Sequence, residues 1–596
     1  MAHDIWAVPL AVNDFNIVVA FLGGFISVFG LVSYLLKENY YMSEALISLL
    51  VGVAFGPHAA DFIRPYSFAA CQRDGLTDAQ CDDRLMSITL NFSRLVLGVQ
   101  LVLAGVQLPS KYLWKQVKPI LLLVGPGMAC MWMATSLLVW GLIGTPSFLH
   151  ALAVGACVTP TDPVLSAVIV KGKFADHNIP KDLQDLIVAE SGTNDGLGYP
   201  FLFFALYLIK YTGAGASEGG AAEAMGLWFA YTWAYTILLS IVYGAVVGWV
   251  GKEMLHWAEK RNYVDRESFL VFAIAMALFV LGTCGMVGTD DVLACFIAGN
   301  AFTWDDWFRL QTKDDSLQPT VDMLLNVSIF LWYGAYLPWK EIAHNSVATL
   351  SRLVPLGLLV LLIRRLPWVY GMHKLIPQIR QHRQAIFVGF FGPIGVSAVF
   401  YLFISIEFIK THLSDENGVP RSDVKDLSET VTIVVWFLAV CSTVVHGLSI
   451  PLGKLGYLAP RIHRSLSETI SETFSYHSTH GIGSRISSMG RLFRRPAENP
   501  EANLAARVRS GTAPITRTGQ GPVPSKIKEG GAETARPDGA SGTHRDNISG
   551  SPNAGTASEA EAGGSGTRTP ARRDIVFFDE VRLESPGSNG NADQSV

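Results

Sequence analysis

Two short polar segments lie inside apolar stretches of the chain, where a charged side chain is costly. They read TPTDP at 159–163 and ESGTNDG at 190–196. Each supplies a carboxylate, Asp162 or Asp195, together with hydroxyl, amide or backbone oxygen atoms. Oxygen atoms grouped in this way at membrane depth predict a site for a small cation or a proton.

Asp195 is best placed to carry the ion. It lies four residues after Ser191, so both share one helix face, while Glu190 and Asn194 share a neighbouring face. Apolar residues flank the segment, and a carboxyl group that has lost its water can hold and release either a proton or a metal cation. We therefore predict that Asp195 binds the ion. The alternative is a buried charge neutralised by a structural partner.

The segment around Asp162 is predicted to interrupt a membrane helix. Pro160 and Pro163 break the ladder of backbone hydrogen bonds. Backbone groups freed at membrane depth are tolerated only inside protein or around a wet cavity. Thr161 and Asp162 would then bring a carbonyl, a hydroxyl and a carboxylate to the interruption. The alternative is a plain kink, which would not require a carboxylate.

A second interruption is expected in the other half of the chain. The segment GFFGPIGVS at 389–397 places Gly392, Pro393 and Gly395 inside an apolar block. Two broken helices, one in each half, are typical of transporters built from inverted repeats, with the substrate site where the breaks cross. Asn194 is placed to bond to the loose backbone ends of such a crossing.

Arginines at membrane depth need partners. Arg364 and Arg365 follow each other in an apolar block, and Glu190 is a buried acid that needs a base. We expect a structural ion pair between Arg365 and Glu190, with Arg364 as the alternative partner.

A third acidic position lies at Asp290 and Asp291, where an apolar block begins. One of them is a candidate functional carboxylate at a cavity mouth. The alternative is helix N-capping by Thr289 or Asp290. For four other polar residues we expect packing or polar-network roles: Arg94, Gln100, Asp322 and His446.

These side chains require a scaffold of membrane helices. Half of the residues are hydrophobic and only 16% are charged, against about 25% charged in soluble domains. A helix that crosses a bilayer needs about 20 apolar residues. The sequence predicts an all-α polytopic membrane protein with twelve or thirteen such helices, in inverted repeats with two crossed, discontinuous helices. The apolar blocks are 16–36, 43–57, 88–108, 119–144, 150–170, 183–209, 226–250, 267–285, 289–302, 321–338, 352–372, 384–408 and 430–454.

Lysine and arginine set the orientation, because they are enriched in cytoplasmic loops. The basic residues collect on one side of this arrangement, for example Lys111, Lys115 and Lys118. This pattern places the N-terminus outside, if there are thirteen passes, and the C-terminus inside. Cys71 and Cys81 share a loop on the outer side, where a disulfide is possible. The other five of the seven cysteines lie in apolar blocks without metal-ligand spacing.

The chain divides into two parts. Residues 1–455 form the expected membrane domain, and 456–596, rich in Ser, Gly, Pro and Arg, form an expected disordered cytoplasmic tail. The apolar island at 574–581 is a candidate partner-binding motif in that tail. No cleavable signal peptide is expected, because the first residues lack a basic region and the first apolar run is long.

The motifs together resemble the fungal plasma-membrane sodium(potassium)/proton antiporters of the cation:proton antiporter superfamily, in the monovalent cation:proton antiporter type 1 group. The resemblance covers almost the whole membrane part. The matching segments are SYLLK at 33–37, GVAFGP at 52–57, TDP at 161–163, AESGTNDG at 189–196, DD at 290–291, AFTWDDWF at 301–308, RLPWV at 365–369 and GFFGPIG at 389–395.

The resemblance implies a homodimer in which a core domain carries the crossed helices past a static dimerisation domain. It implies that Asp195 binds the ion with help from Ser191, Asp162 and the Thr161 carbonyl, and that Asp290 and Asp291 are linked to transport. The implied function is exchange of cytosolic Na⁺, and of Li⁺ or K⁺, for external H⁺ across the plasma membrane, serving salt tolerance and the homeostasis of pH and cations. Regulatory proteins are candidate partners of the tail. No cofactor, enzymatic activity or nucleic-acid partner is expected.

Three other functions compete with this one. An intramembrane aspartyl protease also needs two membrane aspartates, but the GLGY segment at 196–199 lacks the aspartate that those enzymes carry in its final place. A cation channel would lack proton coupling, and a sensor would keep the fold without transport. The sequence leaves open the choice between Na⁺ and K⁺, and also the stoichiometry.

Overall fold

The computed structural model describes residues 13–451 apart from 35, 37–41, 70, 164, 167–177, 214, 217 and 416–418. The predicted tail at 456–596, with its island at 574–581, lies outside the described residues, and so do residues 35 and 37 of the segment 33–37. Within the described part the regular structure is helical, and a single isolated β-bridge joins Ser414 to Pro420. The predicted all-α class is confirmed.

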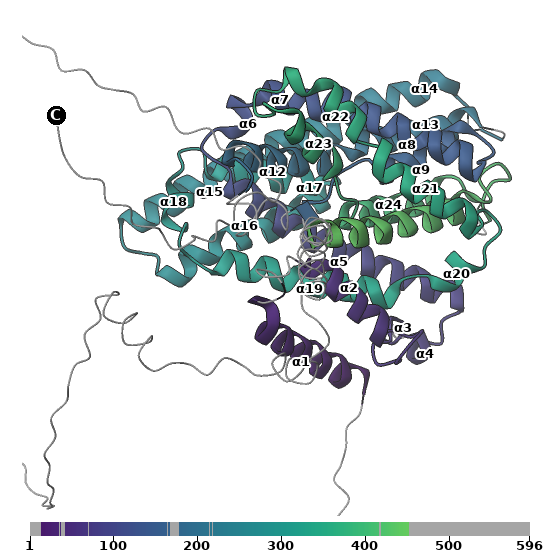
Figure 1. Cartoon of the computed structure of the whole chain (residues 1–596), viewed down its shortest axis with the longest axis horizontal. Coiled ribbons are helices and arrows are strands. Elements are labelled where there is room, and N and C mark those ends of the chain that lie inside the picture. Colours follow the sequence, from purple (N-terminus) through teal and green to yellow (C-terminus); the bar gives the residue numbers. More distant parts are fainter. Residues whose placement is uncertain are drawn as a thin grey trace, which may run out of the picture. The chain divides into compact units, whose positions relative to one another are not determined.

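The helices follow one another along the chain with short connections (Figure 1). Their bounds are α1 Asp14–Tyr34, α2 Glu44–Phe55, α3 Pro65–Phe68, α4 Cys71–Asp74, α5 Asp78–Gln107, α6 Tyr112–Lys115, α7 Val117–Leu122, the π-helix η2 Leu123–Gly127, α8 Met128–Ile143, α9 Phe148–Cys157, α12 Lys181–Gly196, α13 Gly198–Thr212, α14 Gly220–Leu227, the π-helix η3 Trp228–Leu238, α15 Leu239–Lys260, α16 Arg266–Val287, α17 Asp291–Phe302, α18 Trp307–Gln311, α19 Leu317–Tyr336, α20 Trp339–Ala343, α21 Leu350–Ile363, α22 Leu366–Met372, the 3₁₀ helix η4 His373–Leu375, α23 His382–Phe390, α24 Val396–His412 and a last helix Leu427–Pro451.

Seven helices of the described chain are long and apolar enough to cross a membrane. They are Asp14–Val32, Asp78–Gln107, Val117–Ile143, Gly220–Lys260, Arg266–Val287, Leu350–Leu375 and Leu427–Pro451. The other predicted blocks also carry helices: α19 is continuous over Leu317–Tyr336, α2 and α17 are short, and α9, α12–α13 and α23–α24 lie at interruptions. A broken helix crosses the membrane in two pieces, each shorter than a full span. The protein is therefore a multi-pass membrane protein.

Glycines bring helices from the two halves of the chain into close contact. In the pair α2–α19, a Cβ atom on Gly52 would lie 2.2 Å from the carbonyl oxygen of Leu331, and one on Gly334 would lie 2.3 Å from that of Leu49. In the pair α5–α17, a Cβ atom on Gly299 would lie 2.4 Å from the carbonyl oxygen of Val102. Small residues are the usual means of close helix packing in membranes. These contacts join α2 and α5 of the first half to α17 and α19 of the second.

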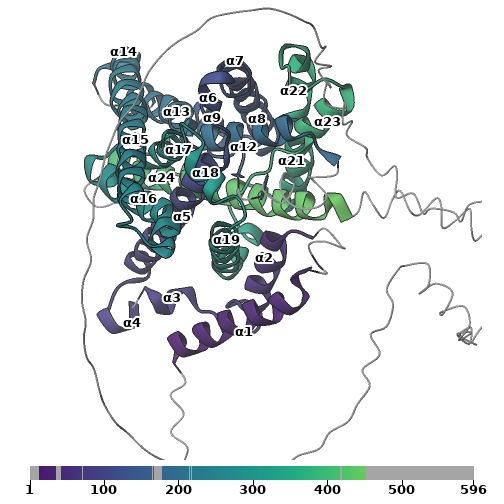
Figure 2. The same ribbon diagram turned by 90° about the vertical axis from the view of Figure 1, so that its left-hand side faces the viewer.

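Helices α12 and α17, which carry most of the predicted acidic residues, lie inside the bundle, and most of their residues are buried (Figures 1 and 2). Helix α1 differs, because only 6% of its apolar window is buried in this chain. It lies at the edge of the bundle in both views. Its apolar surface is thus available to lipid or to another protein chain.

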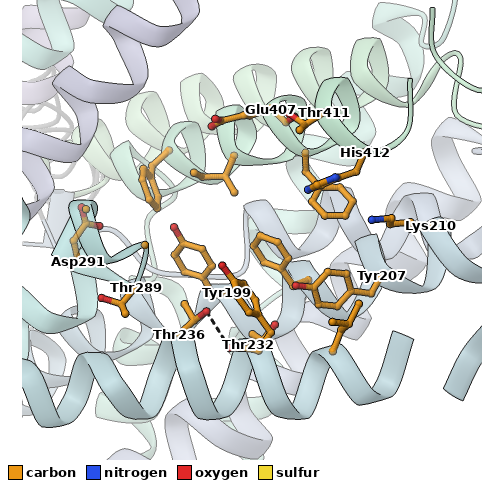
Figure 3. A pocket seen from close by; sticks show the side chains of 18 of the residues that line it. Tyr199, Tyr207, Lys210, Thr232, Thr236, Thr289, Asp291, Glu407, Thr411 and His412 are labelled. Carbon is orange, nitrogen blue, oxygen red and sulfur yellow. Dashed lines mark hydrogen bonds between the residues drawn. The ribbon is translucent and has the colours of Figure 1, made fainter. Parts of the chain in front are cut away.

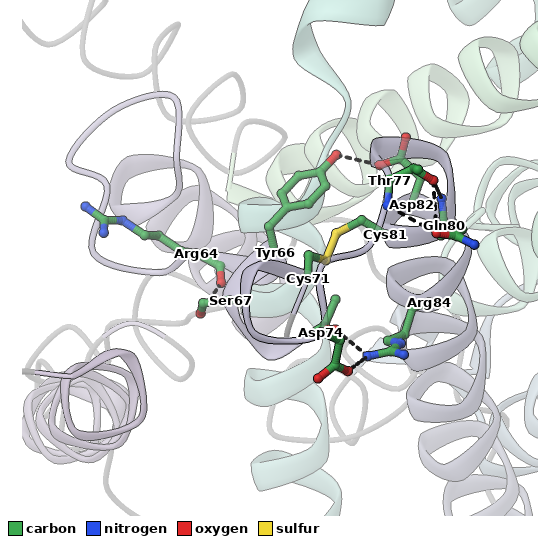
Figure 4. The surroundings of a disulfide bond; sticks show 11 residues. Arg64, Tyr66, Ser67, Cys71, Asp74, Thr77, Gln80, Cys81, Asp82 and Arg84 are labelled. Atoms are coloured by element: carbon green, nitrogen blue, oxygen red, sulfur yellow. Dashed lines mark hydrogen bonds and ion pairs between the residues drawn. A yellow bond between two sulfur atoms is a disulfide. The ribbon is translucent and has the colours of Figure 1, made fainter.

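The disulfide that the sequence left open joins α4, in the connection between α2 and α5, to the first turn of α5. Cys71 and Cys81 are bonded, with their Cα atoms 5.5 Å apart (Figure 4). Thr77 caps the start of α5 through a capping box with Gln80. An ion pair between Arg84 and Asp74, with nitrogen and oxygen 2.5 Å apart, joins α5 to α4. The disulfide and the ion pair both fix the loop to the first turns of α5.

Candidate ion-binding site

The two predicted interruptions meet inside the protein. Helix α9 ends at Cys157, and α23 ends at Phe390. Between the two breaks, the amide of Asp162 donates to the carbonyl oxygen of Pro393 at 3.0 Å. The amide of Ile394 donates to the Ser442 hydroxyl at 2.7 Å. The backbone groups released by the prolines and glycines are thus satisfied across the crossing, as buried backbone groups must be.

Glycines make room for this crossing. A Cβ atom on Gly395 would lie 2.1 Å from an Asp162 carboxylate oxygen, and one on Gly392 would lie 2.2 Å from Cδ of Arg365. Neither distance leaves space for any side chain. Pro163 begins the helical turn that resumes after the first break, and Asp162 accepts a hydrogen bond from the Leu165 amide at 3.3 Å there.

Arg364 binds the carbonyl groups that the breaks release. Its guanidinium donates to the carbonyl oxygens of Val158, Thr159 and Pro160, at 3.2 Å and 3.3 Å for the last two, and to that of Gly392 in the other break. The sequence predicts Arg364 only as an alternative partner for Glu190, and this contact with backbone carbonyl groups was not predicted. The available signal is a second arginine at membrane depth in a chain whose Pro160 and Pro163 leave carbonyl groups without helical partners.

Arg365 and Glu190 form the predicted ion pair. Two guanidinium nitrogens lie 2.5 Å and 2.7 Å from the two carboxylate oxygens, and both side chains are buried. The Arg365 Nε atom also donates to the Val388 carbonyl oxygen at 2.9 Å. This bidentate geometry joins α12 to the α22–α23 region and neutralises the acid that neighbours the site.

Asn194 and Ser191 contact the first break. The Asn194 side-chain oxygen accepts from the Thr161 amide at 3.1 Å, and its nitrogen donates to the Thr161 hydroxyl at 2.8 Å. The Ser191 and Thr161 hydroxyl oxygens are 3.1 Å apart. Asn194 thus bonds to the loose backbone ends, as the sequence reasoning suggested. Thr161, Asp162, Ser191 and Asn194 lie in one buried cluster.

Asp195 is fully buried beside this cluster. Among the described residues neither of its carboxylate oxygens has a hydrogen-bond partner, and the Ser397 hydroxyl lies nearby without reaching ordinary hydrogen-bond geometry. The carboxylates of Asp162 and Asp290 are close enough to interact with it electrostatically. A buried carboxylate without hydrogen bonds is unfavourable unless it binds a proton or a cation. Sequence reasoning missed Ser397, because only the crossing brings α24 beside α12.

Asp290 and Asp291 have different surroundings. One Asp290 oxygen caps α17 by accepting from the Leu293 amide at 2.9 Å, as the capping alternative predicted, and the other has no partner among the described residues. Asp291 instead forms an ion pair with Arg94 of α5. Polar networks also hold the remaining residues: Gln100 contacts Asp322 and Asn326, and His446 contacts Ser442 and Phe390.

A cavity of about 680 Å³ lies between α13, η3, α16 and α24 (Figure 3). Asp291 and Thr289 lie at one end, and Lys210 and His412 lie at the other. Its walls combine aromatic rings with polar side chains, and they do not include Asp195, Asp162 or Ser191. Within the described chain no three His, Cys, Asp or Glu residues are grouped to hold a metal ion.

The sequence is similar to known antiporters. Residues 23–452 match the family described as sodium/hydrogen exchanger, transmembrane. A Na⁺/H⁺ antiporter of Saccharomyces cerevisiae is 35% identical over 82% of this chain and 48% of its own length. Na⁺/H⁺ antiporter 2 of Zygosaccharomyces rouxii is 36% identical over 75% of this chain and 54% of its own length. The chain thus spans about half the length of these two relatives. A Na⁺/H⁺ antiporter of Schizosaccharomyces pombe, 30% identical over 77% of this chain, is covered over 96% of its length.

Among solved structures, the fold is similar to that of the sodium proton antiporter MjNhaP1 from Methanocaldococcus jannaschii, solved at pH 8. The TM-score is 0.52, and the match covers 73% of this chain and 98% of that one. At 16% sequence identity, this likeness concerns the fold alone.

Proposed function

The chain belongs to the transmembrane sodium/hydrogen exchanger family, and on that basis we propose that it exchanges a monovalent cation for protons, with Asp195 carrying both in turn. The observation that carries the proposal is the fully buried Asp195 carboxylate, which has no hydrogen-bond partner among the described residues and lies beside the crossing of two broken helices. An occupant must compensate this charge. A proton and a small cation both do so, and they exclude each other.

In the proposed cycle Asp195 releases a proton towards the cytosol and binds Na⁺. The Ser191 hydroxyl, the Asp162 carboxylate and the Thr161 carbonyl replace part of the water that the cation loses. The loaded core turns to the other side, where Na⁺ leaves and an external proton takes its place. Asn194 keeps the first break in position through its two hydrogen bonds to Thr161.

Coupling follows from the cost of moving an empty carrier. An ionised, unoccupied Asp195 would cross the low-dielectric interior with an uncompensated charge, which is strongly unfavourable. Only the protonated and the cation-loaded forms then change sides at a useful rate. A ligand drives the change because it binds the two states differently.

We propose that this exchange takes place in the plasma membrane and that the candidate cations are Na⁺, Li⁺ and K⁺. We also propose that the exchange supports salt tolerance and pH homeostasis. The names of the fungal relatives support Na⁺ and H⁺ as substrates. We also propose a homodimer, a membrane domain at 1–455 and a cytoplasmic tail at 456–596 that binds regulatory proteins. Asp290 contributes to the site a further buried carboxylate near Asp195. Asp291 is linked to transport through its ion pair with Arg94.

The proposal is tested with the purified chain in vesicles, where a pH-sensitive dye reports proton movement after Na⁺, Li⁺ or K⁺ is added. Asp195→Asn keeps the shape of the side chain but cannot ionise, so exchange should fall to background with every cation. Asp182→Asn is the matched control, because Asp182 lies in the first turn of the same helix with its side chain 75% exposed. Exchange that survives in Asp195→Asn refutes the assignment of the carrier. Cation flux that a pH gradient does not drive identifies a channel instead.

A further inference from the structure

Asp195 continues a stripe of aromatic residues on one side of α12 and α13. Tyr199, Phe203, Tyr207 and Tyr211 follow it at intervals of four residues, and all four line the cavity of Figure 3. We call it the outer cavity, because its end at Lys210 and His412 lies on the side that the loop charges predict to be external. The first three rings of this stripe contact each other, with centroids 5.6 Å apart for Tyr199 and Phe203 and 5.5 Å apart for Phe203 and Tyr207. The spacing places Asp195 one helical turn beyond the innermost ring. The cavity therefore ends one turn short of the carrier.

Helix α24 repeats this arrangement from the opposite side. Phe400, Ile404 and Phe408 line the cavity at intervals of four residues, and at the other end of the same wall Thr411 and His412 are exposed. Tyr401 follows Phe400 but does not line the cavity, and Ser397 lies one turn further in, near the Asp195 carboxylate. Both helices thus present an aromatic ring one turn outside the polar site.

Tyr401 closes the gap between these two helices. Its ring is fully buried, and its centroid lies 5.5 Å from that of Tyr199 in an edge-to-face contact. A Cβ atom on Gly198 would lie 2.4 Å from the Tyr401 ring, so only glycine allows this approach. The rings of Tyr199, Phe400 and Tyr401 form one aromatic layer.

The hydroxyl of Tyr401 has a separate task. It donates to the backbone carbonyl of Asp195 and lies 3.2 Å from that of Gly196. These carbonyl groups belong to the last turn of α12, where helical hydrogen bonding ends. Tyr401 therefore fixes the end of the helix that carries Asp195.

We propose that Tyr401 is the outer gate and a positioning residue of the ion pathway: its ring, with Tyr199, separates the outer cavity from Asp195, and its hydroxyl holds the end of α12. The inference rests on the proposed function for its consequence in transport. Its structural part, closure of the pathway at this layer, does not require that the protein transports anything.

Closure is tested by the reactivity of a cysteine placed behind the layer. Ser397→Cys in the full chain, reconstituted in vesicles, is treated with a charged maleimide from the cavity side. Labelling should be slow with Tyr401 present, equally slow in Ser397→Cys/Tyr401→Phe, and at least about tenfold faster in Ser397→Cys/Tyr401→Ala. Tyr401→Ala alone is the control for the native cysteines. If Tyr401→Ala does not fold, Tyr199→Ala replaces it in the same measurement, because it removes a ring of the same layer from α13.

Fast labelling of Ser397→Cys with both tyrosines intact, or no acceleration in either alanine variant, refutes the gate. The same measurement in an Asp195→Asn chain separates the two proposals, because labelling does not depend on exchange. If only exchange fails, the proposal that Tyr401 closes the pathway still holds. If only labelling is fast, the proposal that Asp195 carries the ion still holds.

The positioning role is tested by Tyr401→Phe in the exchange assay. This change keeps the ring and removes only the hydroxyl, so the half-saturating cation concentration should change several-fold while the maximal rate changes less. Tyr207→Phe removes a hydroxyl from the same cavity further from Asp195 and should leave both quantities unchanged. If the half-saturating concentration of Tyr401→Phe equals that of the unaltered chain, the hydroxyl has no positioning role.

Discussion

Arg364 and Arg365 are neighbours in the sequence, yet they stabilise different parts of the site. Arg364 donates to four backbone carbonyl groups that the two breaks release. Arg365 neutralises Glu190 through two short hydrogen bonds. Glu190 and Asp291 have arginine partners, whereas neither carboxylate oxygen of Asp195 has a hydrogen-bond partner among the described residues. At the scale of residues, Asp195 is therefore distinguished by the lack of a partner at both of its oxygens.

We expect Arg365→Gln to destabilise the protein strongly. The change leaves Glu190 buried without its cation, and breaking a buried ion pair from one side costs about 3–5 kcal/mol. The unfolding temperature of the purified protein in detergent should fall accordingly. Arg380→Gln is the control, because that arginine is 60% exposed and lies 3.9 Å from Asp182, and exposed pairs contribute about 0–1 kcal/mol.

The double variant Glu190→Gln/Arg365→Gln checks the physical reason. It removes both charges, so it should regain part of the stability lost in Arg365→Gln. A double variant as unstable as Arg365→Gln would contradict an account based on an uncompensated charge.

At the scale of elements, the crossing depends on the absence of side chains as much as on their presence. The break after α9 and the break before α24 approach so closely that Gly395 meets the Asp162 carboxylate directly. The same approach puts the Pro393 carbonyl within hydrogen-bonding distance of the Asp162 amide. Any side chain at Gly395 must therefore separate the two breaks.

We expect Gly395→Ala to impair exchange and to lower stability, since forcing extra atoms into a packed interior costs about 1–3 kcal/mol. Gly371→Ala in α22 is the control, because a Cβ atom there meets nothing within 4 Å. Both variants are compared by unfolding temperature and by Na⁺-driven proton movement. Unaltered exchange in Gly395→Ala would show that the tight crossing is not needed for function.

At the scale of the whole molecule, the orientation in the membrane connects the site to its two compartments. The loop with the Cys71–Cys81 disulfide and the exposed end of the cavity at His412 both fall on the side that the loop charges predict to be external. Disulfides persist in oxidising compartments. The disulfide and the loop charges therefore favour the same orientation.

We expect the Cys71–Cys81 disulfide to be accessible from outside intact cells. A membrane-impermeant reductant followed by a charged maleimide should label the full chain, and Cys71→Ser/Cys81→Ser should remove that labelling. Labelling that appears only after the cells are permeabilised would reverse the proposed orientation.

The sequence predicts the class of the protein, its candidate carrier and the Arg365–Glu190 pair. Each follows from the free-energy cost of placing a charge or a free backbone group at membrane depth, which can be recognised within one short segment. Long apolar blocks, a proline-rich break and a charge at membrane depth are visible one segment at a time. The roles of Arg364, Ser397 and Tyr401 were not, because their partners are backbone groups and side chains far away in the sequence. Nothing in the segment around Tyr401 indicates that its hydroxyl meets the end of α12.

The sequence by itself therefore determined a helical membrane protein with two interrupted helices and a buried aspartate, since hydrophobicity and backbone breaks are properties of short segments. Only the tertiary structure decided that the two interruptions meet and that Glu190 and Asp291 have arginine partners. Only it left both Asp195 oxygens without a hydrogen-bond partner among the described residues. Only it brought the rings of Tyr199, Phe400 and Tyr401 together. The physical reason is that pairing and closure depend on distances between α12, α22 and α24, and those distances arise from packing of the whole bundle.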